Sequence, residues 1–120
     1  MKVLITDDSR VMRQIVKRTL RQAGYTDVKV CEAGNGREAL DVIASEAPDL
    51  VLCDWNMPEM SGVELLTALR AKGRNVPFGF VTSEGSPEMR ERAASAGAMF
   101  LISKPFTPEA FKEALEPVLG

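Results

Sequence analysis

Residues 50–54 read Leu-Val-Leu-Cys-Asp, a continuous apolar run that ends at a carboxylate. An uninterrupted apolar run of this length is typical of a strand buried on both faces, as in a parallel sheet. Similar short runs lie on either side of it, and segments with helical spacing separate them. We predict five strands, at Val3–Thr6, Asp27–Cys31, Leu50–Cys53, Phe78–Thr82 and Phe100–Ser103.

Each strand is followed by a predicted helix, and each of these helices begins at a capping residue. Ser9 precedes the first helix, and a serine there can accept hydrogen bonds from the free amide groups of the first turn. Asn35 and Ser61 are each followed three residues later by Glu, as in a capping box. Ser86 and Thr107 precede proline, which favours the first helical position. The predicted helices cover residues 10–23, 35–47, 61–73, 86–97 and 107–118.

The alternation of five strands with five helices predicts an α/β fold of the (βα)5 type. Strands that alternate with single helices form a parallel sheet with helices on both faces. Right-handed crossovers leave few topologies for such a chain. Because no linker, repeat or low-complexity segment interrupts the pattern, we expect residues 1–120 to form one domain.

Composition excludes several classes of function. The 120 residues include 15 Lys and Arg, 17 Asp and Glu, and no His, so the formal net charge is −2. A chain without His has no Ser–His or Cys–His nucleophile pair and no His-ligated zinc. The slight negative charge predicts no binding to nucleic acid or to an anionic membrane. No apolar run reaches the ~18 residues of a membrane span, so we expect a cytoplasmic protein.

Polar residues gather at the predicted strand ends. In a parallel sheet these ends share one edge, where open α/β sheets bind their ligands. We therefore expect three carboxylates, one hydroxyl and one ammonium group in a small crevice. The residues are Asp7, Asp8, Asp54, Thr82 and Lys104.

These residue types point to phosphoryl chemistry with magnesium. Carboxylates packed together repel one another unless a cation compensates them. A site with oxygen ligands alone favours Mg²⁺, which also binds phosphate oxygens. Transfer of a phosphoryl group needs positioned charges more than covalent chemistry. Without a Ser–His or Cys–His pair, the available nucleophile is an aspartate carboxylate, which would give an acyl phosphate.

Four motifs stand at the ends of the first, third, fourth and fifth predicted strands. They are Asp7-Asp8-Ser9, Asp54-Trp55-Asn56-Met57-Pro58, Val81-Thr82-Ser83 and Lys104-Pro105-Phe106. With these motifs in this order and spacing, the whole chain resembles a response-regulator receiver domain of two-component signalling, most like the stand-alone chemotaxis response regulators. The resemblance implies a doubly wound, flavodoxin-like sheet of order 2-1-3-4-5.

The resemblance implies a role for each site residue. Asp54 would be the phospho-acceptor. Asp8, Asp54 and the main-chain carbonyl of Asn56 would bind Mg²⁺ directly. Asp7 would bind it through water. Thr82 and Lys104 would contact phosphoryl oxygens, and the peptide bond before Pro105 would be cis. Asn56 and Glu84 occupy the positions where the family tunes dephosphorylation.

The resemblance also implies partners. A histidine kinase would supply the phosphoryl group from a phosphohistidine, or a small acyl phosphate would replace it. Phosphorylation would repack the face formed by the last two helices and the strand between them. We expect a downstream target such as a flagellar motor switch component, a phosphatase as a further partner, and a monomer or weak dimer. The sequence ends after the last helix, so we expect a receiver that acts through its own surface.

Other functions remain open at this stage. The chain could be a phosphate sink, a phosphorelay intermediate or a fragment of a longer regulator. A degenerate receiver used only for binding is disfavoured because all five site residues are present. An aspartate-nucleophile phosphatase is disfavoured because Asp7 and Asp8 are adjacent rather than one residue apart. A flavodoxin-like FMN binder is disfavoured because the same aspartates would repel a phosphate.

Two positions depart from the family pattern. Leu101 stands where the family usually has Tyr or Phe, so either Leu101 or another residue reports the switch, unless it is only an edge-strand hydrophobe. Gly79 lies inside a strand, and we expect a bulky helix side chain to pack over it.

Three further features allow structural interpretations. Val11, Ile15, Val16, Thr19 and Leu20 form the apolar positions of the first helix, and a stripe of cations at positions 10, 13, 17 and 21 forms a solvated face or a docking face. Cys31 and Cys53 flank the first strand in the 2-1-3 order, too far apart for a disulfide. Trp55 is expected to be half-exposed.

Overall fold

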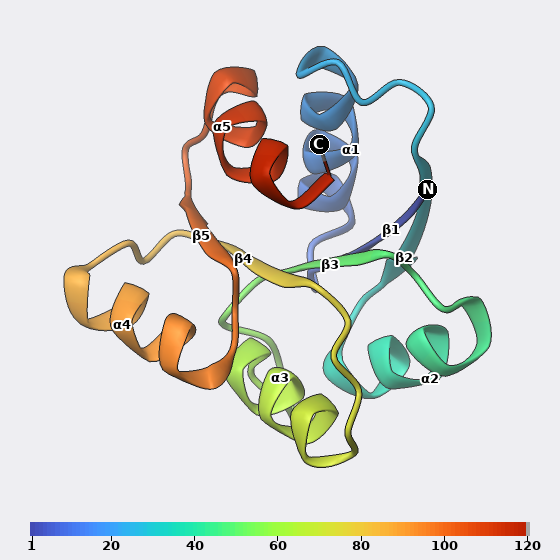
Figure 1. Cartoon of the computed structure of the whole chain (residues 1–120), viewed down its shortest axis with the longest axis vertical. Helices are drawn as coiled ribbons and strands as arrows, with labels where there is room; N and C mark the ends of the chain where they lie inside the picture. Colours follow the sequence, from blue (N-terminus) through green and yellow to red (C-terminus); the bar gives the residue numbers. More distant parts are fainter. Residues whose placement is uncertain (120) are drawn as a thin grey trace.

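The computed structural model describes residues 1–119, which form a five-stranded parallel sheet between two layers of helices (Figure 1). The strands lie in the order β2-β1-β3-β4-β5, as expected for a flavodoxin-like fold. The elements along the chain are β1 (Lys2–Thr6), α1 (Arg10–Gln22), β2 (Lys29–Ala33), α2 (Gly36–Glu46), β3 (Leu50–Cys53), α3 (Gly62–Ala71), β4 (Phe78–Thr82), α4 (Pro87–Ala96), β5 (Phe100–Ser103) and α5 (Pro108–Leu119).

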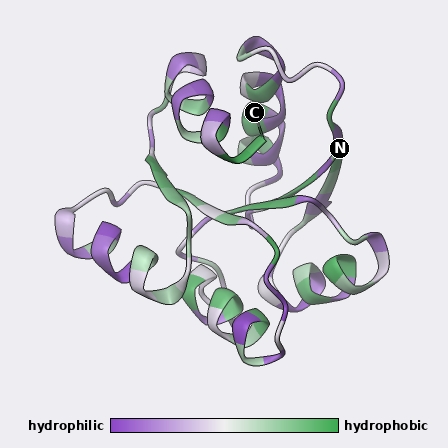
Figure 2. Ribbon diagram, viewed as in Figure 1, coloured by the Kyte–Doolittle hydropathy of each residue, from purple (hydrophilic) through white to green (hydrophobic). Residues whose placement is uncertain are grey.

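The sheet buries a separate apolar cluster on each face. Figure 1 shows α1 and α5 on one face and α2, α3 and α4 on the other. Successive side chains of a strand point to opposite faces, so Val3 and Ile5 pack under α1 and α5 while Leu4 packs under the other three helices. The helices turn their apolar sides toward the sheet in the same way (Figure 2). Both faces of the central strands are therefore buried.

The predicted helix starts are confirmed. Ser9 Oγ accepts a hydrogen bond from Met12 N, and Ser61 forms a reciprocal capping box with Glu64. These bonds satisfy amide groups that a first helical turn leaves free. The side chains of the other three caps accept in the same way: Asn35 from Glu38 N, Ser86 from Met89 N, and Thr107 from Ala110 N.

The second strand lies two residues later than predicted. It covers Lys29–Ala33 rather than Asp27–Cys31, because its residues pair in register with β1, where Ala33 lies opposite Thr6. Cys31 consequently lies in the middle of the strand. Cys31 and Cys53 are both free thiols, as expected, because β1 separates their strands.

Gly79 is covered by a neighbouring strand, not by a helix as predicted. Gly79 pairs with Phe100 of β5, and a Cβ atom at position 79 would overlap the Phe100 ring. The aromatic ring thus occupies the space that any larger residue at position 79 would need. A larger residue at position 79 would therefore require the Phe100 ring to move.

Only part of the apolar stripe predicted for α1 is buried. Val16, Thr19 and Leu20 face the sheet, whereas Val11 is 70% exposed and Ile15 is 37% exposed. Helices α1 and α5 lie side by side on the same sheet face, so α1 turns its inner face between the sheet and α5. Within residues 1–119, no helix is both long and apolar enough to span a membrane.

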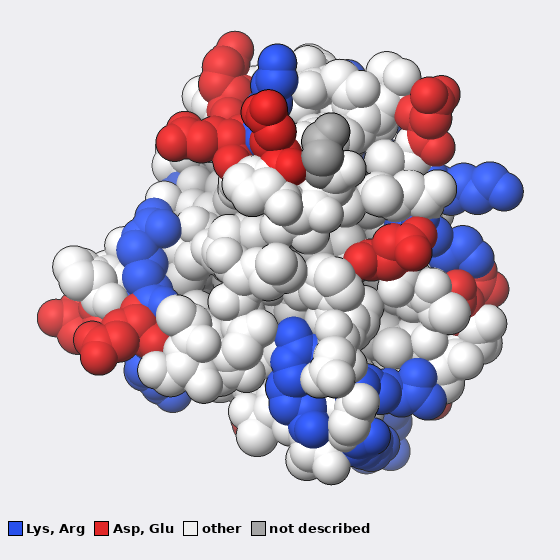
Figure 3. Space-filling view, viewed as in Figure 1, with Lys and Arg blue, Asp and Glu red and all other residues white. Residues whose placement is uncertain are grey.

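Charges of both signs are interspersed on the face drawn in Figure 3. Acidic side chains gather over α5, which contains Glu109, Glu113 and Glu116. Uncharged atoms cover the centre of this view.

Candidate phosphorylation site

The sheet brings the three predicted carboxylates together. Asp7 and Asp8 follow β1 and Asp54 follows β3, and backbone bonds extend the strand pairing to this point: Asp54 N donates to the Thr6 carbonyl at 2.9 Å. One carboxylate oxygen from each aspartate lies within 4.8 Å of the others. Asp7 is buried, Asp54 is partly buried and Asp8 is exposed. The cluster thus opens to solvent on the side of Asp8.

Lys104 approaches this cluster from β5. Its Nζ atom lies 3.1 Å from Asp7 Oδ2 and 3.5 Å from Asp54 Oδ2. The backbone also ties it to β4, because Lys104 N donates to the Thr82 carbonyl at 2.7 Å. The Lys104–Pro105 peptide bond is cis, as the resemblance implied. One ammonium group therefore partly compensates two carboxylates.

The Asp54 carboxylate is held at one oxygen and accessible to Lys104 at the other. Oδ1 accepts a hydrogen bond from Trp55 N at 2.8 Å, and the side chain is only 12% exposed. Burial raises the pKa of Asp54 above its ordinary value, and the charge of Asp7 raises it further, against the opposing effect of Lys104. A bound cation would relieve this excess of negative charge.

Thr82 ends β4, and Glu84 follows it in the next loop. Thr82 is fully buried, and its Oγ1 accepts a long hydrogen bond of 3.5 Å from Glu84 N. The Glu84 carboxylate accepts a bond of 3.2 Å from Asn56 Nδ2. Asn56 and Glu84 are both exposed, so this pair lies at the mouth of the site.

Trp55 is buried, and its prediction as a half-exposed loop residue is wrong. The side chain is 5% exposed. Its ring centroid lies 4.7 Å from that of Phe80, and the Arg92 guanidinium lies 5.4 Å from the indole centroid. The loop after β3 folds back over α3, with Gly62 N bonded to the Trp55 carbonyl. Loop position alone therefore did not predict exposure.

Arg13 has a role that the cation stripe did not reveal. It donates through Nε to Glu32 at 2.9 Å and through Nη1 to the Asp7 carbonyl at 2.6 Å. The helix places Arg13 one turn after the Ser9 cap, directly against the end of β1. Arg13 thus braces the Asp7 backbone, whereas Arg10 and Arg21 remain exposed.

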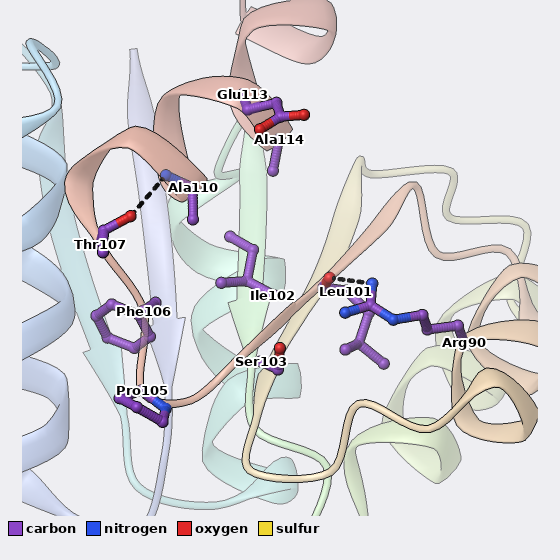
Figure 4. A pocket seen from close by; sticks show the side chains of 10 residues that line it. All are labelled: Arg90, Leu101, Ile102, Ser103, Pro105, Phe106, Thr107, Ala110, Glu113 and Ala114. Atoms are coloured by element: carbon purple, nitrogen blue, oxygen red, sulfur yellow. Dashed lines mark hydrogen bonds between the residues drawn. The ribbon is translucent and has the colours of Figure 1, made fainter.

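Leu101 lies on β5 beside a hollow of about 470 Å³ between α4 and α5 (Figure 4). The leucine side chain is 8% exposed and packs in the cluster on the α4 side of the sheet. Its carbonyl accepts a hydrogen bond from Arg90 of α4, drawn in Figure 4. Sequence patterns did not indicate Arg90, because its role depends on which strand lies at the sheet edge.

The family model of the response regulator receiver domain matches residues 3–116. The chain therefore belongs to the response regulator receiver family. The site described above lies wholly inside the matched region.

Within this family the chain closely matches the CheY chemotaxis response regulators. It is 46% identical over 123 residues to the CheY homologue of Campylobacter jejuni, covering all of this chain and 93% of that protein. Identity to CheY1 of Helicobacter pylori J99 is also 46%, with 98% of that protein covered. CheY of Pseudomonas aeruginosa is 41% identical over 98% of this chain and 95% of its own length.

Solved structures agree with this assignment. CheY4 of Vibrio cholerae superposes with a TM-score of 0.85 at 38% identity, and 98% of each chain is covered. The receiver domain of Francisella response regulator 1452 superposes with a TM-score of 0.83 at 26% identity, covering 98% of this chain and 94% of that one.

Phosphorylation and partner switching are the general function of this family, which is a signalling family and not a family of catalytic enzymes. Its members typically use Mg²⁺, and a CheY-like receiver implies in general a histidine kinase donor and a downstream target such as the flagellar switch.

Proposed function

We propose that Asp54 is the phospho-acceptor and that its phosphorylation switches partner binding in chemotaxis signalling. The observation that carries this proposal is the position of Asp54 Oδ2, which lies 3.5 Å from Lys104 Nζ at the rim of the carboxylate cluster. The other oxygen is engaged by Trp55 N, so Oδ2 is the oxygen that can attack. The chain as a whole, residues 1–120, would act as one receiver domain.

The transfer step is a displacement at phosphorus. Asp54 Oδ2 forms a new bond to the phosphorus atom while the P–N bond to the donor imidazole breaks and its electron pair returns to that ring. Lys104 pairs with one phosphoryl oxygen, and the Thr82 hydroxyl donates to another. Positioned cations and donors of this kind supply most of the catalysis in phosphoryl transfer.

The residues present fit a magnesium ion. Three carboxylates within 4.8 Å, without His or Cys among them, form the hard oxygen donor set that Mg²⁺ prefers. Asp8, Asp54 and the Asn56 carbonyl would hold the ion directly, with Asp7 through water. When bound, the ion supplies positive charge that neutralises carboxylate and phosphoryl oxygens.

Further properties follow from the same proposal. The domain would catalyse only its own phosphotransfer and dephosphorylation, with Asn56 and Glu84 tuning the hydrolysis rate from the mouth of the site. We place the protein in the cytoplasm as a monomer or weak dimer. Its partners would be a histidine kinase, a flagellar switch component and a phosphatase. The alternative role is a phosphate sink, a relay intermediate or part of a longer regulator.

The test uses acetyl phosphate with Mg²⁺, followed by intact-protein mass spectrometry. We expect one phosphoryl group on the wild type and none on Asp54→Ala. Asp41→Asn, at an exposed aspartate of α2, is the matched control and should be phosphorylated normally. Phosphorylation of Asp54→Ala would refute the assignment of Asp54 as the acceptor. Equal incorporation of phosphate by the wild type with and without EDTA would refute the role of magnesium.

A further inference from the structure

Arg90 joins three segments of the molecule through one guanidinium group. It projects from α4 and donates through Nη1 to the Leu101 carbonyl at 2.9 Å and through Nε to the Gly85 carbonyl at 3.2 Å. Leu101 belongs to β5, the edge strand of the sheet. Gly85 belongs to the loop of residues 83–86 between β4 and α4. The relative position of loop and strand therefore bears on whether both bonds can be kept.

The loop of residues 83–86 is tied directly to the phosphorylation site. It begins immediately after Thr82, and Glu84 N donates to the Thr82 hydroxyl. The Glu84 side chain is bonded to Asn56, two residues beyond Asp54. At its other end, Ser86 caps α4 through Met89 N. These contacts give a displacement of Thr82 a route to the loop and to the first turn of α4.

Strand β5, in contrast, is held by the sheet. Leu101 pairs with Phe80 and Ser103 pairs with Thr82 in register. The Leu101 side chain is buried among apolar groups and has no polar atom with which to follow a new charge. The position that carries an aromatic side chain in typical family members therefore has no polar group here, and Arg90 supplies a polar link across this region.

We propose that Arg90 transmits the phosphorylation of Asp54 to the surface formed by α4, β5 and α5, which rests on the function proposed above. A phosphoryl group on Asp54 draws Thr82 and the loop toward the site. Arg90 then keeps its bond to Gly85 and loses its bond to Leu101. The freed cation borders the hollow between α4 and α5, whose lining includes Glu113 (Figure 4). The charge presented to a partner on this surface changes accordingly.

The chemistry of arginine suits this role. A guanidinium group carries five N–H donors in a planar fork, so it can bond two carbonyl groups in fixed directions at once. A lysine at position 90 could direct its donors only from one atom. Lysine would therefore retain the charge of the surface but not both bonds.

The test is amide NMR of the full chain with Mg²⁺, before and after addition of beryllofluoride as a phosphoryl mimic. The Ile102 amide nitrogen reports the hydrogen bond on the Leu101 carbonyl, because both belong to one peptide group. In the wild-type protein, we expect the amide signals of both Thr82 and Ile102 to shift on addition of beryllofluoride. Arg90→Met should keep the Thr82 shift and lose at least two thirds of the change at Ile102. Arg90→Lys should lose at least half of it, while its thermal unfolding confirms a folded domain.

Arg92→Met is the matched control, since Arg92 lies on the same helix but contacts Trp55 instead of β5. It should keep both shifts. A full Ile102 shift in Arg90→Met, or loss of that shift in Arg92→Met, overturns the inference, as does a wild type that shifts at Thr82 but not at Ile102. Absence of any wild-type shift at Thr82 would instead refute the proposed function, and the inference with it.

Discussion

The ammonium group of Lys104 lies 3.1 Å from Oδ2 of Asp7, although the two residues are 97 positions apart in the chain. The same ammonium group lies 3.5 Å from Asp54 Oδ2. The ammonium group thus places positive charge against two of the three carboxylates that could hold a metal ion. We therefore expect Lys104 and a bound Mg²⁺ to repel each other.

Replacing Lys104 by Met should tighten Mg²⁺ binding. A unit charge about 4 Å away contributes roughly 1–4 kcal/mol between the dielectric of water and that of a protein surface, so we expect affinity to rise by about three- to tenfold after partial screening. Trp55 lies beside Asp54 and should report the titration by fluorescence. Lys112→Met, at an exposed lysine of α5, is the control. Unchanged affinity in Lys104→Met would show that Lys104 does not compete with the ion.

Asp54→Asn should stabilise the metal-free protein at neutral pH. The pKa of Asp54 is raised above its ordinary 3.8 in the folded state, chiefly by burial. A carboxyl group of this kind contributes stability below pH 3.8 that is lost as pH rises through the folded-state pKa. Urea unfolding in EDTA should show the variant as more stable at pH 7, with the gain shrinking as the pH falls toward 4. Adding Mg²⁺ should narrow the difference, because the ion stabilises the wild-type carboxylate. A gain that grows toward low pH would contradict the assignment.

Gly79→Ala should destabilise the fold, although alanine normally suits a strand better than glycine. Its Cβ atom would overlap the Phe100 ring, and overpacking of this kind costs about 1–3 kcal/mol. In Phe100→Leu the ring is absent, so the cost of Gly79→Ala should fall by at least about 0.5 kcal/mol. Denaturant unfolding of the wild type, the two single variants and the double variant measures this coupling. Additive effects would mean that the ring is not the obstacle.

Cys53 should be far less reactive than Cys31. Cys53 is fully buried, and burial together with Asp54 and Asp7 raises the pKa of its thiol well above the ordinary value. Burial also raises the pKa of the Cys31 thiol, but Cys31 is only partly buried. The thiolate is the reactive form, so native iodoacetamide labelling should be at least about a hundredfold slower at Cys53 and follow opening of the fold. Peptide mass spectrometry gives both rates. Equal rates in the native protein would contradict the burial of Cys53.

The elements were predictable because their signals are local. Apolar runs such as Leu50–Cys53 and caps such as Ser61 with Glu64 depend on residues within one turn of each other. The second strand was misplaced by two residues because its limits depend on pairing with β1, which is a long-range property. The predicted exposure of Trp55 was wrong for a related reason, since Phe80 and Arg92 cover its ring from other elements.

The amino-acid order by itself determined the βα alternation, the carboxylates at the strand ends and the family of the protein, because periodicity, capping and motif spacing are properties of neighbouring residues. Tertiary structure alone decided that Lys104 lies between Asp7 and Asp54, that Phe100 excludes a side chain at Gly79, and that Arg90 spans Gly85 and Leu101. The Lys104, Phe100 and Arg90–Leu101 contacts each join residues from separate strands, helices or loops. Their geometry depends on the order in which strands pair and on the packing between layers, which no local pattern encodes.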